Sequence, residues 1–590
     1  MLNNPILQQT LQLQQKASDP KHSVFVSASA GSGKTKILTD RVLRLLLSGV
    51  HPAKILCLTF TKVAAFEMQN RIHKKLEQWV FLKQNKLEEE ISSLLGFKPS
   101  KIQINNARIL FIKTLDANPG LKISTIHSFC EKLIRKFPIE IKINPNFQII
   151  DGQKEYQLLQ DSKKELLKTA LTDHELANKI ENITSLLNEN SFSEVILELI
   201  NKREKLITLK EQYCDINGVI EKIYKILNCK ISDDEKAIDR LICEPDFNKQ
   251  NLLLLSNYMT ESSKSTDLNN KDAILNYINQ PDKDNFQQYK SIFLKQDEEA
   301  KAISSIATKK SVLEKFPEAE SIIETEQRRV LNLVNHINSI SIAKSTSNLL
   351  FVADRMLNIY IDLKNKNGLL DYNDLINKTA HLLQDSTNSE WIKYKLDGQL
   401  EHILIDESQD TNLYQWSIIN ALTEEFFSGA SSNENNRTIF IVGDEKQSIY
   451  SFQGADPKIF SNIYYDYKEK SSFVDRQIQD IALGNSFRSS KTVLEVVDSV
   501  FSKTEHGKAI SKLKEVKHNA VKDNFFGRVE LWPIVNVNQE EEKCEEEYEW
   551  QINFTKEIKS DSKELLAKTI AQTIKKWIDE KRILKNKMKA

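Results

Sequence analysis

A run of small residues that ends in Lys and Thr carries the clearest chemical signal in the sequence. It follows the apolar run HSVFV and comprises Ala28, Ser29, Ala30, Gly31, Ser32, Gly33, Lys34 and Thr35. Small residues let backbone N–H groups curl around phosphates, and the N-terminus of the following helix favours the same negative charge. In this Walker A spacing, with Ala28 where the first glycine usually stands, Lys34 would reach the β and γ phosphates and Thr35 would bind Mg²⁺. We therefore expect ATP and Mg²⁺ as cofactors rather than a loop that only turns the chain, because the order is strand, loop, helix.

Two carboxylates stand where a second buried strand should end. The apolar run HILI at 402–405 leads directly into Asp406 and Glu407. Asp406 would hold Mg²⁺ partly through its water shell, and Glu407 would orient or deprotonate the water that attacks ATP. A solvated acidic turn is the alternative, and it is disfavoured because a phosphate-binding loop requires such a partner.

The segments around these motifs alternate between strand and helix patterns. Between about residues 22 and 136, short apolar runs such as KILCLTF are each followed by a helical pattern, which predicts an α/β fold with a parallel sheet. Residues 137–365 are rich in Lys, Asn, Glu, Ile and Leu with long helical periodicities, which predicts a large helical insertion. Strand patterns return at 402–407 and 438–444, so we expect the sheet to resume after the insertion.

The bulk composition narrows the class of protein. A chain of 590 residues should divide into three or four units. Lys+Arg and Asp+Glu number 82 each, so any DNA contact must come from local groups rather than from net charge. The cysteines are scattered with no CxxC pair, which disfavours a disulfide framework or a zinc site. No apolar run approaches the ~18 residues that cross a bilayer, so we expect a cytoplasmic protein with no membrane contact.

The order of the motifs resembles that of the superfamily 1A (UvrD/Rep-like) DNA helicases. The family's DExQD motif stands here as DESQD at 406–410. The other strings are QQKASDP with Gln14, LTFTKVAAFEM (58–68), STIHSF (124–129), LLDYNDLI (369–376), VGDEKQSIYSFQGADP (442–457) and NSFRSS (485–490). Their form is most similar to the AddA/RecB type of double-strand-break repair helicase–nuclease.

The resemblance implies a P-loop NTPase with RecA-like motor domains. It assigns residues 1–136 and 366–478 to a discontinuous first motor domain, 1A. It assigns 137–365 to a 1B-like helical insertion, and 479–590 to an incomplete second motor domain, 2A, with the start of a 2B-like insertion.

The resemblance also assigns residues to the nucleotide. It implies that Gln14 reads the adenine, that Gln447 senses the γ-phosphate, and that Arg488 contacts this phosphate from the second motor domain. Strings that match the family's motifs V and VI, or its nuclease domain, are not found before Ala590. We therefore expect a motor fragment whose activity alone is in doubt, because a missing arginine finger can cost ~10³ to 10⁵ in rate.

Two strings carry residue types that suit single-stranded DNA. Thr59, Thr61 and Lys62 offer hydroxyls and a cation for phosphates, and Phe60 offers a ring for a base. Tyr450 and Phe452 stand two positions apart, like rungs on which successive bases could stack. The alternative is that Phe60 and Phe452 belong to the core. His127 would contact a DNA phosphate or be a satisfied structural residue.

These observations together predict an ATP-dependent 3′-to-5′ DNA helicase motor of double-strand-break repair. Polarity and pathway come from the resemblance alone. Its partners would be single- and double-stranded DNA, an AddB-like component of the nuclease complex, and a separately encoded C-terminal half. A non-motor DNA-binding module that uses ATP as a switch, or an inactive remnant, stays open as an alternative. A kinase or GTPase is disfavoured by Gln409 and Gln447 and by the absence of an NKxD string.

Overall fold

The computed structural model divides the chain into two compact units. One unit comprises Met1–Pro145 and Tyr372–Ala590, and the other comprises Asn146–Asp371. The structure describes residues 5–233, 235–384, 389–397, 400–427, 437–449, 457–472, 477–502, 505–506, 518–521, 527–534 and 562–581.

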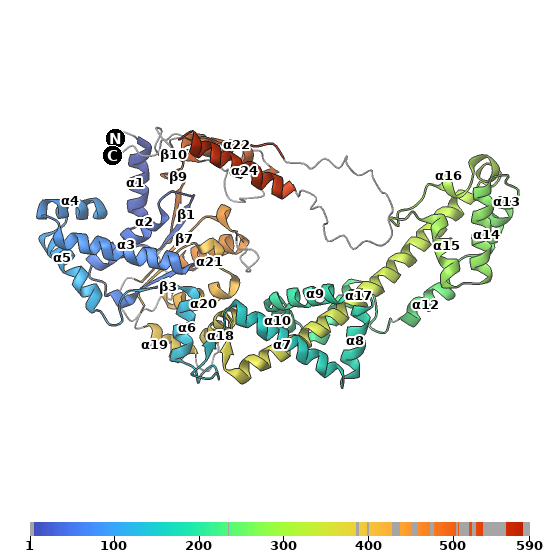
Figure 1. The fold of residues 1–590 in the computed structure, drawn as a ribbon, viewed down its shortest axis with the longest axis horizontal. Coiled ribbons are helices and arrows are strands. Elements are labelled where there is room, and N and C mark those ends of the chain that lie inside the picture. The colour runs from blue at the N-terminus through green and yellow to red at the C-terminus, as the bar shows by residue number, and fades with distance from the viewer. Residues whose placement is uncertain are drawn as a thin grey trace. The chain divides into compact units, whose positions relative to one another are not determined.

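A six-stranded parallel sheet forms the centre of the first unit (Figure 1). In spatial order its strands are β3 (Lys122–Thr125), β2 (Ile55–Thr59), β6 (His402–Ile405), β7 (Thr438–Gly443), β1 (Val24–Ala28) and β8 (Gln479–Leu483). Every residue of β2, β6 and β7 is buried, as expected for parallel strands that helices cover on both faces. The predicted α/β fold with a parallel sheet is confirmed.

Helices follow the strands along the chain of this unit. Before the break in this unit they are α1 (Pro5–Ala17), α2 (Lys34–Leu47), α3 (Lys62–Phe81), α4 (Gln84–Leu95), α5 (Lys101–Asp116) and α6 (Ile126–Lys136). After it they are α18 (Tyr372–Gln384), α19 (Ser389–Asp397), α20 (Leu413–Thr423), α21 (Pro457–Ser472), α22 (Lys491–Phe501) and α24 (Ser562–Asp579). Short 3₁₀ turns stand at Pro52–Lys54, Ser408–Asp410, Glu424–Phe427 and Glu445–Gln447. The apolar core gathers around β1, α2 and α3, with Trp79 fully buried.

The first unit's sheet extends further along the chain than the expected boundary at residue 478. β8 pairs in parallel with β1 along its whole length, from Val24 opposite Gln479 to Ala28 opposite Leu483. A strand's membership is decided by its hydrogen-bonded neighbour, whereas the family resemblance assigned 479–590 to the second motor domain. The strands that follow, β9 (Asn485–Ser486) and β10 (Asn519–Ala520), form a separate parallel pair.

The second unit is helical, and its long α17 (Ala319–Asn367, 49 residues) contributes to two apolar cores. The other helices are α7 (Gly152–Ala170), α8 (His174–Thr184), α9 (Glu189–Asn201), α10 (Arg203–Gln212), α11 (Ile216–Ile226), α12 (Glu235–Cys243), α13 (Lys249–Thr260), α14 (Ser265–Asn279), α15 (Lys283–Phe293) and α16 (Ile303–Ile306), with a π turn at Lys309–Leu313. The two-residue strands β4 (Gln148–Ile149) and β5 (Leu369–Leu370) pair where this unit begins and ends. The helical insertion was expected over 137–365, whereas the unit runs from Asn146 to Asp371.

Among the described residues, no helix combines the length and the apolar character needed to cross a membrane.

Candidate nucleotide site and nucleic-acid contacts

The small-residue loop joins β1 to α2 at the carboxyl edge of the sheet. Gly31 and Gly33 have φ angles of +75° and +94°, a left-handed conformation that glycine adopts without strain. The loop closes on itself through Ser32 N, which donates to Ser29 O at 3.2 Å. Ala28 is buried at the end of β1. The loop therefore has the strand, turn and helix N-terminus that a phosphate site requires.

Two further positions of the loop pattern are Ala30 and Thr35. Ala30 is exposed, and Thr35 is half-buried as the second residue of α2.

The acidic turn after β6 lies against Lys34. Lys34 Nζ is 2.8 Å from Glu407 Oε2, although these residues are 373 positions apart. Glu407 has a φ of +49°, which is uncommon for a residue other than glycine. The parallel order of β6, β7 and β1 makes the contact, because their carboxyl ends meet at one edge of the sheet.

Asp406 is a buried carboxyl group in the same turn. Burial raises its pKa from 3.8 to about 7, with the neighbouring charge of Glu407 adding to the shift and Lys34 opposing it. Burial and Glu407 likewise raise the pKa of Asp410 to about 6. A cation at this turn would stabilise the ionised forms, so the electrostatics fit a metal ion.

The donors present also fit Mg²⁺. In the described part of the chain, no group of three or more His, Cys, Asp or Glu side chains could hold a metal. Mg²⁺ in nucleotide sites is held by one or two protein ligands together with substrate phosphates and water. The Thr35 hydroxyl and the Asp406 carboxylate are donor groups of that kind.

Gln409 connects the acidic turn to the turn after β7. Its Nε2 donates to Glu407 Oε2 at 2.8 Å, and its Oε1 accepts from Asp444 N at 2.9 Å. Gln447 N donates to Asp444 O at 2.8 Å, and the Gln447 side chain donates to the Asp444 carboxylate. Glu407 and Gln447 are thus joined by one chain of hydrogen bonds. The sequence offered Gln409 only as part of the family spacing.

Lys446 contacts the small-residue loop, and the sequence interpretation did not predict this contact. Its Nζ donates to Ser29 Oγ of the small-residue loop at 3.2 Å. The signal that could have found it is a lysine immediately before Gln447 and three positions after a buried strand of the same sheet.

Gln14 lies beside the loop and is almost completely buried. Its Nε2 donates to Ser32 O at 3.0 Å, and its Oε1 accepts from Lys36 Nζ at 3.2 Å. Two arginines of α2 hold the helix that carries it. Arg41 donates to the carbonyl oxygens of residues 17, 19 and 22, and Arg44 donates to that of residue 15 and to the hydroxyl of residue 18.

The backbone around Arg488 also lies against the loop. Phe487 N donates to Gly31 O at 2.8 Å. A Cβ added at Gly31 would lie 2.6 Å from Arg488 Cβ and 2.7 Å from Ser486 Oγ. The structure therefore brings Arg488 to the P-loop, where any side chain larger than glycine at position 31 would push it away.

Among the side chains expected to contact DNA, the two threonines already have hydrogen-bond partners within the protein. Thr59 is buried and donates to Thr61 O, and Thr61 accepts from Ala64 N as the N-cap of α3. Lys62 is exposed and Phe60 is half-buried. Both threonine hydroxyls therefore have local structural partners, which the sequence pattern did not reveal.

His127 and Lys62 each follow the end of a strand, and the two strands, β3 and β2, are neighbours in the sheet. Burial lowers the pKa of His127, and the charge of Lys62 lowers it further. The His127 ring meets Tyr372 edge-on, with ring centroids 5.5 Å apart. Tyr450 and Phe452 lie outside the described residues.

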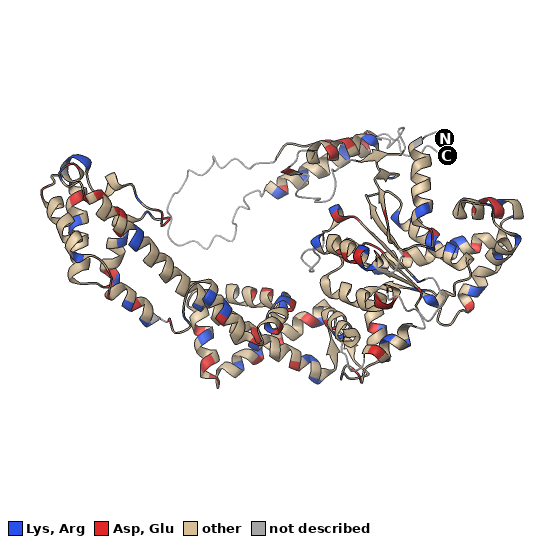
Figure 2. Ribbon diagram, turned by 180° about the vertical axis from the view of Figure 1, so that it is seen from behind, with Lys and Arg blue, Asp and Glu red and all other residues tan. Residues whose placement is uncertain are grey.

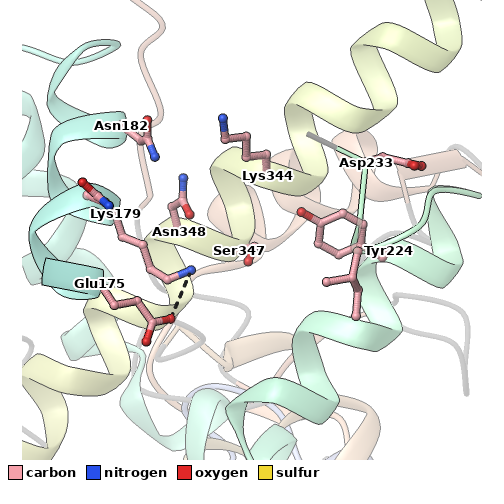
Figure 3. A pocket seen from close by; sticks show the side chains of 10 residues that line it. Glu175, Lys179, Asn182, Tyr224, Asp233, Lys344, Ser347 and Asn348 are labelled. Carbon is pink, nitrogen blue, oxygen red and sulfur yellow. Dashed lines mark ion pairs between the residues drawn. The ribbon is translucent and has the colours of Figure 1, made fainter. Parts of the chain in front are cut away.

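The second unit contains a polar cavity of about 360 Å³ that matches none of the sequence motifs (Figure 3). Its lining comes from α8, α17, α11 and the segment after α11, and comprises Glu175, Asn178, Lys179, Asn182, Tyr224, Ile231, Asp233, Lys344, Ser347 and Asn348. Two lysines balance two carboxylates, so its charge does not favour a polyanion such as a nucleotide.

Comparison with known proteins agrees with this geometry. The family model described as the UvrD/REP helicase N-terminal domain matches residues 9–468. Proteins named as the A subunit of an ATP-dependent helicase/nuclease are similar along most of the chain. That of Lactobacillus acidophilus is 27% identical over 83% of this chain and 40% of its own length, and that of Clostridium beijerinckii is 24% identical over 95% and 45%.

The chain spans less than half the length of these relatives. The matched family model nevertheless covers the small-residue loop, the acidic turn and the turn after β7. The chain therefore belongs to the UvrD/REP helicase family.

Proposed function

We propose that this chain is the ATP-binding motor part of a 3′-to-5′ DNA helicase of double-strand-break repair. The observation that carries the proposal is the 2.8 Å contact between Lys34 Nζ and Glu407 Oε2. It joins a phosphate-binding loop to a carboxylate that can orient water, which are the two parts that nucleotide hydrolysis requires.

The residues around this contact have separate roles in the proposed reaction. Thr35 and Asp406 would hold Mg²⁺, which neutralises charge on the phosphates when it is bound. Lys34 would exchange the Glu407 carboxylate for phosphate, which frees Glu407 to orient the attacking water. Gln447 and Arg488 would contact the γ-phosphate.

The base end of the nucleotide would lie at Gln14. This side chain is held beside the loop by Ser32 O and Lys36 Nζ. An amide fixed in this way presents a donor and an acceptor to adenine.

We propose DNA as the substrate and a second protein of the same complex as the partner. Support comes from family membership and from relatives whose name includes helicase and nuclease and identifies them as one subunit of a larger assembly. The DNA would contact Lys62, Phe60 and His127 together with Tyr450 and Phe452. An AddB-like protein in the cytoplasm is the proposed partner.

The domain assignment follows from the same proposal. The sheet of the first unit, through β8, corresponds to motor domain 1A, and Asn146–Asp371 corresponds to the 1B-like insertion. The segment from β9 onward corresponds to the start of 2A.

ATP turnover of the purified chain, with and without single-stranded DNA, tests the proposal. We expect DNA to stimulate turnover, and we expect Glu407→Gln to lower it ~10² to 10⁴-fold while nucleotide still binds. Unchanged turnover in Glu407→Gln would refute the assigned site. Binding of ATP and DNA without turnover would instead favour a module that uses ATP as a switch.

A further inference from the structure

The turn after β7 places an ammonium group against the phosphate-binding loop. Lys446 Nζ lies 3.2 Å from Ser29 Oγ, and Ser29 is itself held by a hydrogen bond from its N–H to Leu483 O at 3.0 Å. The sheet order explains the proximity, because β7 is the immediate neighbour of β1 and both strands end at the same edge. The fold therefore places the turn that carries Lys446 beside the loop.

Lys446 is held in this place by the backbone of its own turn. The 3₁₀ turn Glu445–Gln447 begins at Asp444, whose carboxylate accepts from Lys446 N at 3.3 Å. Asp444 N in turn donates to the buried Gln409. The turn that carries Lys446 is thus attached to the acidic turn at Glu407.

Within the described part of the chain, no carboxylate forms an ion pair with Lys446. Lys34 has Glu407 at 2.8 Å, whereas no ion pair involves the half-buried Lys446 among the residues that the structure describes. An ammonium group that is partly removed from water and has only a hydroxyl partner gains most from an arriving anion. The loop beside it is the place where phosphates are expected.

The position of Lys446 indicates which end of a bound nucleotide this side chain would contact. Gln14 contacts Ser32 O at the helix end of the loop, which is the proposed adenine side. Lys446 contacts Ser29 at the strand end of the loop, next to Gln447 and joined through Asp444 and Gln409 to Glu407. That is the hydrolytic side, where the terminal phosphate must lie.

We propose that Lys446 is a second cationic ligand for the terminal phosphate of the nucleotide, in addition to Lys34. The proposal rests on the proposed function, because it presupposes that the loop binds ATP. It deepens that function by assigning discrimination between nucleoside triphosphate and diphosphate to a residue of the turn after β7.

Nucleotide affinities of the full chain test this proposal. The probes are fluorescent ADP and a fluorescent non-hydrolysable ATP analogue, each titrated with Mg²⁺ into the wild-type chain and into Lys446→Met. We expect Lys446→Met to weaken the triphosphate analogue about 10- to 100-fold, the range of a lost charge-assisted hydrogen bond, and to change ADP affinity less than about 3-fold. Lys446→Arg should recover most of the triphosphate affinity.

Two further variants make the result specific. Lys470→Met removes a lysine of α21 that is paired with Asp466 at 2.6 Å, and it should leave both affinities unchanged. Lys34→Ala should weaken both nucleotides. Thermal melting of each variant establishes that it is folded, and Lys446→Gln replaces Lys446→Met if the latter melts early.

Each possible result of these titrations either supports or overturns the proposal. A selective loss of triphosphate binding supports the proposal. Equal losses for both nucleotides, or no loss in a folded Lys446 variant, would overturn it while leaving the nucleotide site intact. If the wild-type chain binds neither nucleotide, the proposed function itself is wrong.

Discussion

At the scale of single residues, the acidic turn brings carboxylate groups close together, so their negative charges repel one another. Asp406 is buried next to the Glu407 carboxylate, and the charge of Lys34 and the backbone N–H of Glu407 compensate only in part. Lys34 is already paired with Glu407, and Gln409 donates to the same oxygen. An additional cation at this turn would therefore stabilise its ionised carboxylates.

Replacing Asp406 with asparagine should stabilise the unliganded chain in a pH-dependent manner. The pKa of Asp406 is raised by burial to about 7, so between pH 4 and 7 the folded chain binds more protons than the unfolded chain. The free energy of unfolding then falls as pH rises through this range. We expect the melting temperature of Asp406→Asn to exceed that of the wild type by an amount that grows from pH 5.5 to 7 and levels off above about 7.5, reaching a few degrees.

Thermal melting without nucleotide or metal at pH 5.5, 6.5, 7.5 and 8.5 measures this difference. A gap that is constant with pH, or one that narrows as pH rises, would contradict a carboxyl group with a raised pKa.

At the scale of elements, the loop between β1 and α2 is shaped by what packs on it. Phe487 N donates to Gly31 O, and Ser29 N donates to Leu483 O at the end of β8. On the other side, α1 is attached to α2 through Arg41, which donates to three backbone carbonyl oxygens and to Thr438. Burial lowers the pKa of Arg41 to about 9, which still leaves it protonated at neutral pH.

Gly31→Ala should damage the site, whereas Gly49→Ala should only cost stability. Both glycines have positive φ, but a Cβ at Gly31 would lie 2.6 Å from Arg488 Cβ, and one at Gly49 would meet nothing within 4 Å. We expect Gly49→Ala to cost ~1 to 2 kcal/mol of stability with unchanged nucleotide affinity. Gly31→Ala should cost more stability and weaken ATP binding at least about tenfold, or ~1.4 kcal/mol.

Melting temperatures and fluorescent-nucleotide titrations of the two variants check this pair. Normal nucleotide binding in Gly31→Ala would mean that the loop can move away from Arg488 without loss.

At the scale of the whole molecule, charge is balanced and evenly mixed. Lys+Arg and Asp+Glu number 82 each, and Figure 2 shows both signs interspersed along the helices of each unit. Long-range attraction to DNA is therefore weak, and affinity must come from a few local contacts. Lys62 is a proposed group of this kind, since it is exposed at the start of α3 and its charge lowers the pKa of His127.

The salt dependence of single-stranded DNA binding should report this local contact. Lys62→Ala should reduce the slope of log affinity against log salt by about 0.7, the value for one phosphate contact on a single strand. Lys74→Ala, which removes an exposed lysine further along the same helix, should leave the slope unchanged. Fluorescence anisotropy with a labelled oligonucleotide across a salt series gives both slopes, and equal slopes for wild type and Lys62→Ala would exclude the contact.

The sequence by itself determined the parts that depend on local pattern. Nearly continuous apolar runs predicted β2, β6 and β7, because strands covered on both faces need apolar residues at most positions. The spacing of Gly31, Gly33 and Lys34 predicted the loop, because only small residues permit its backbone conformation.

Only the tertiary structure decided which distant groups meet. The pairing of β8 with β1, the contact of Lys34 with Glu407, and the approach of Lys446 to Ser29 all depend on the lateral order of strands in the sheet. The engagement of Thr59 and Thr61 in capping and turn contacts also appears only in three dimensions. The physical reason is that strand order is set by packing and hydrogen bonding across the sheet, which join segments hundreds of residues apart and leave no trace in local periodicity.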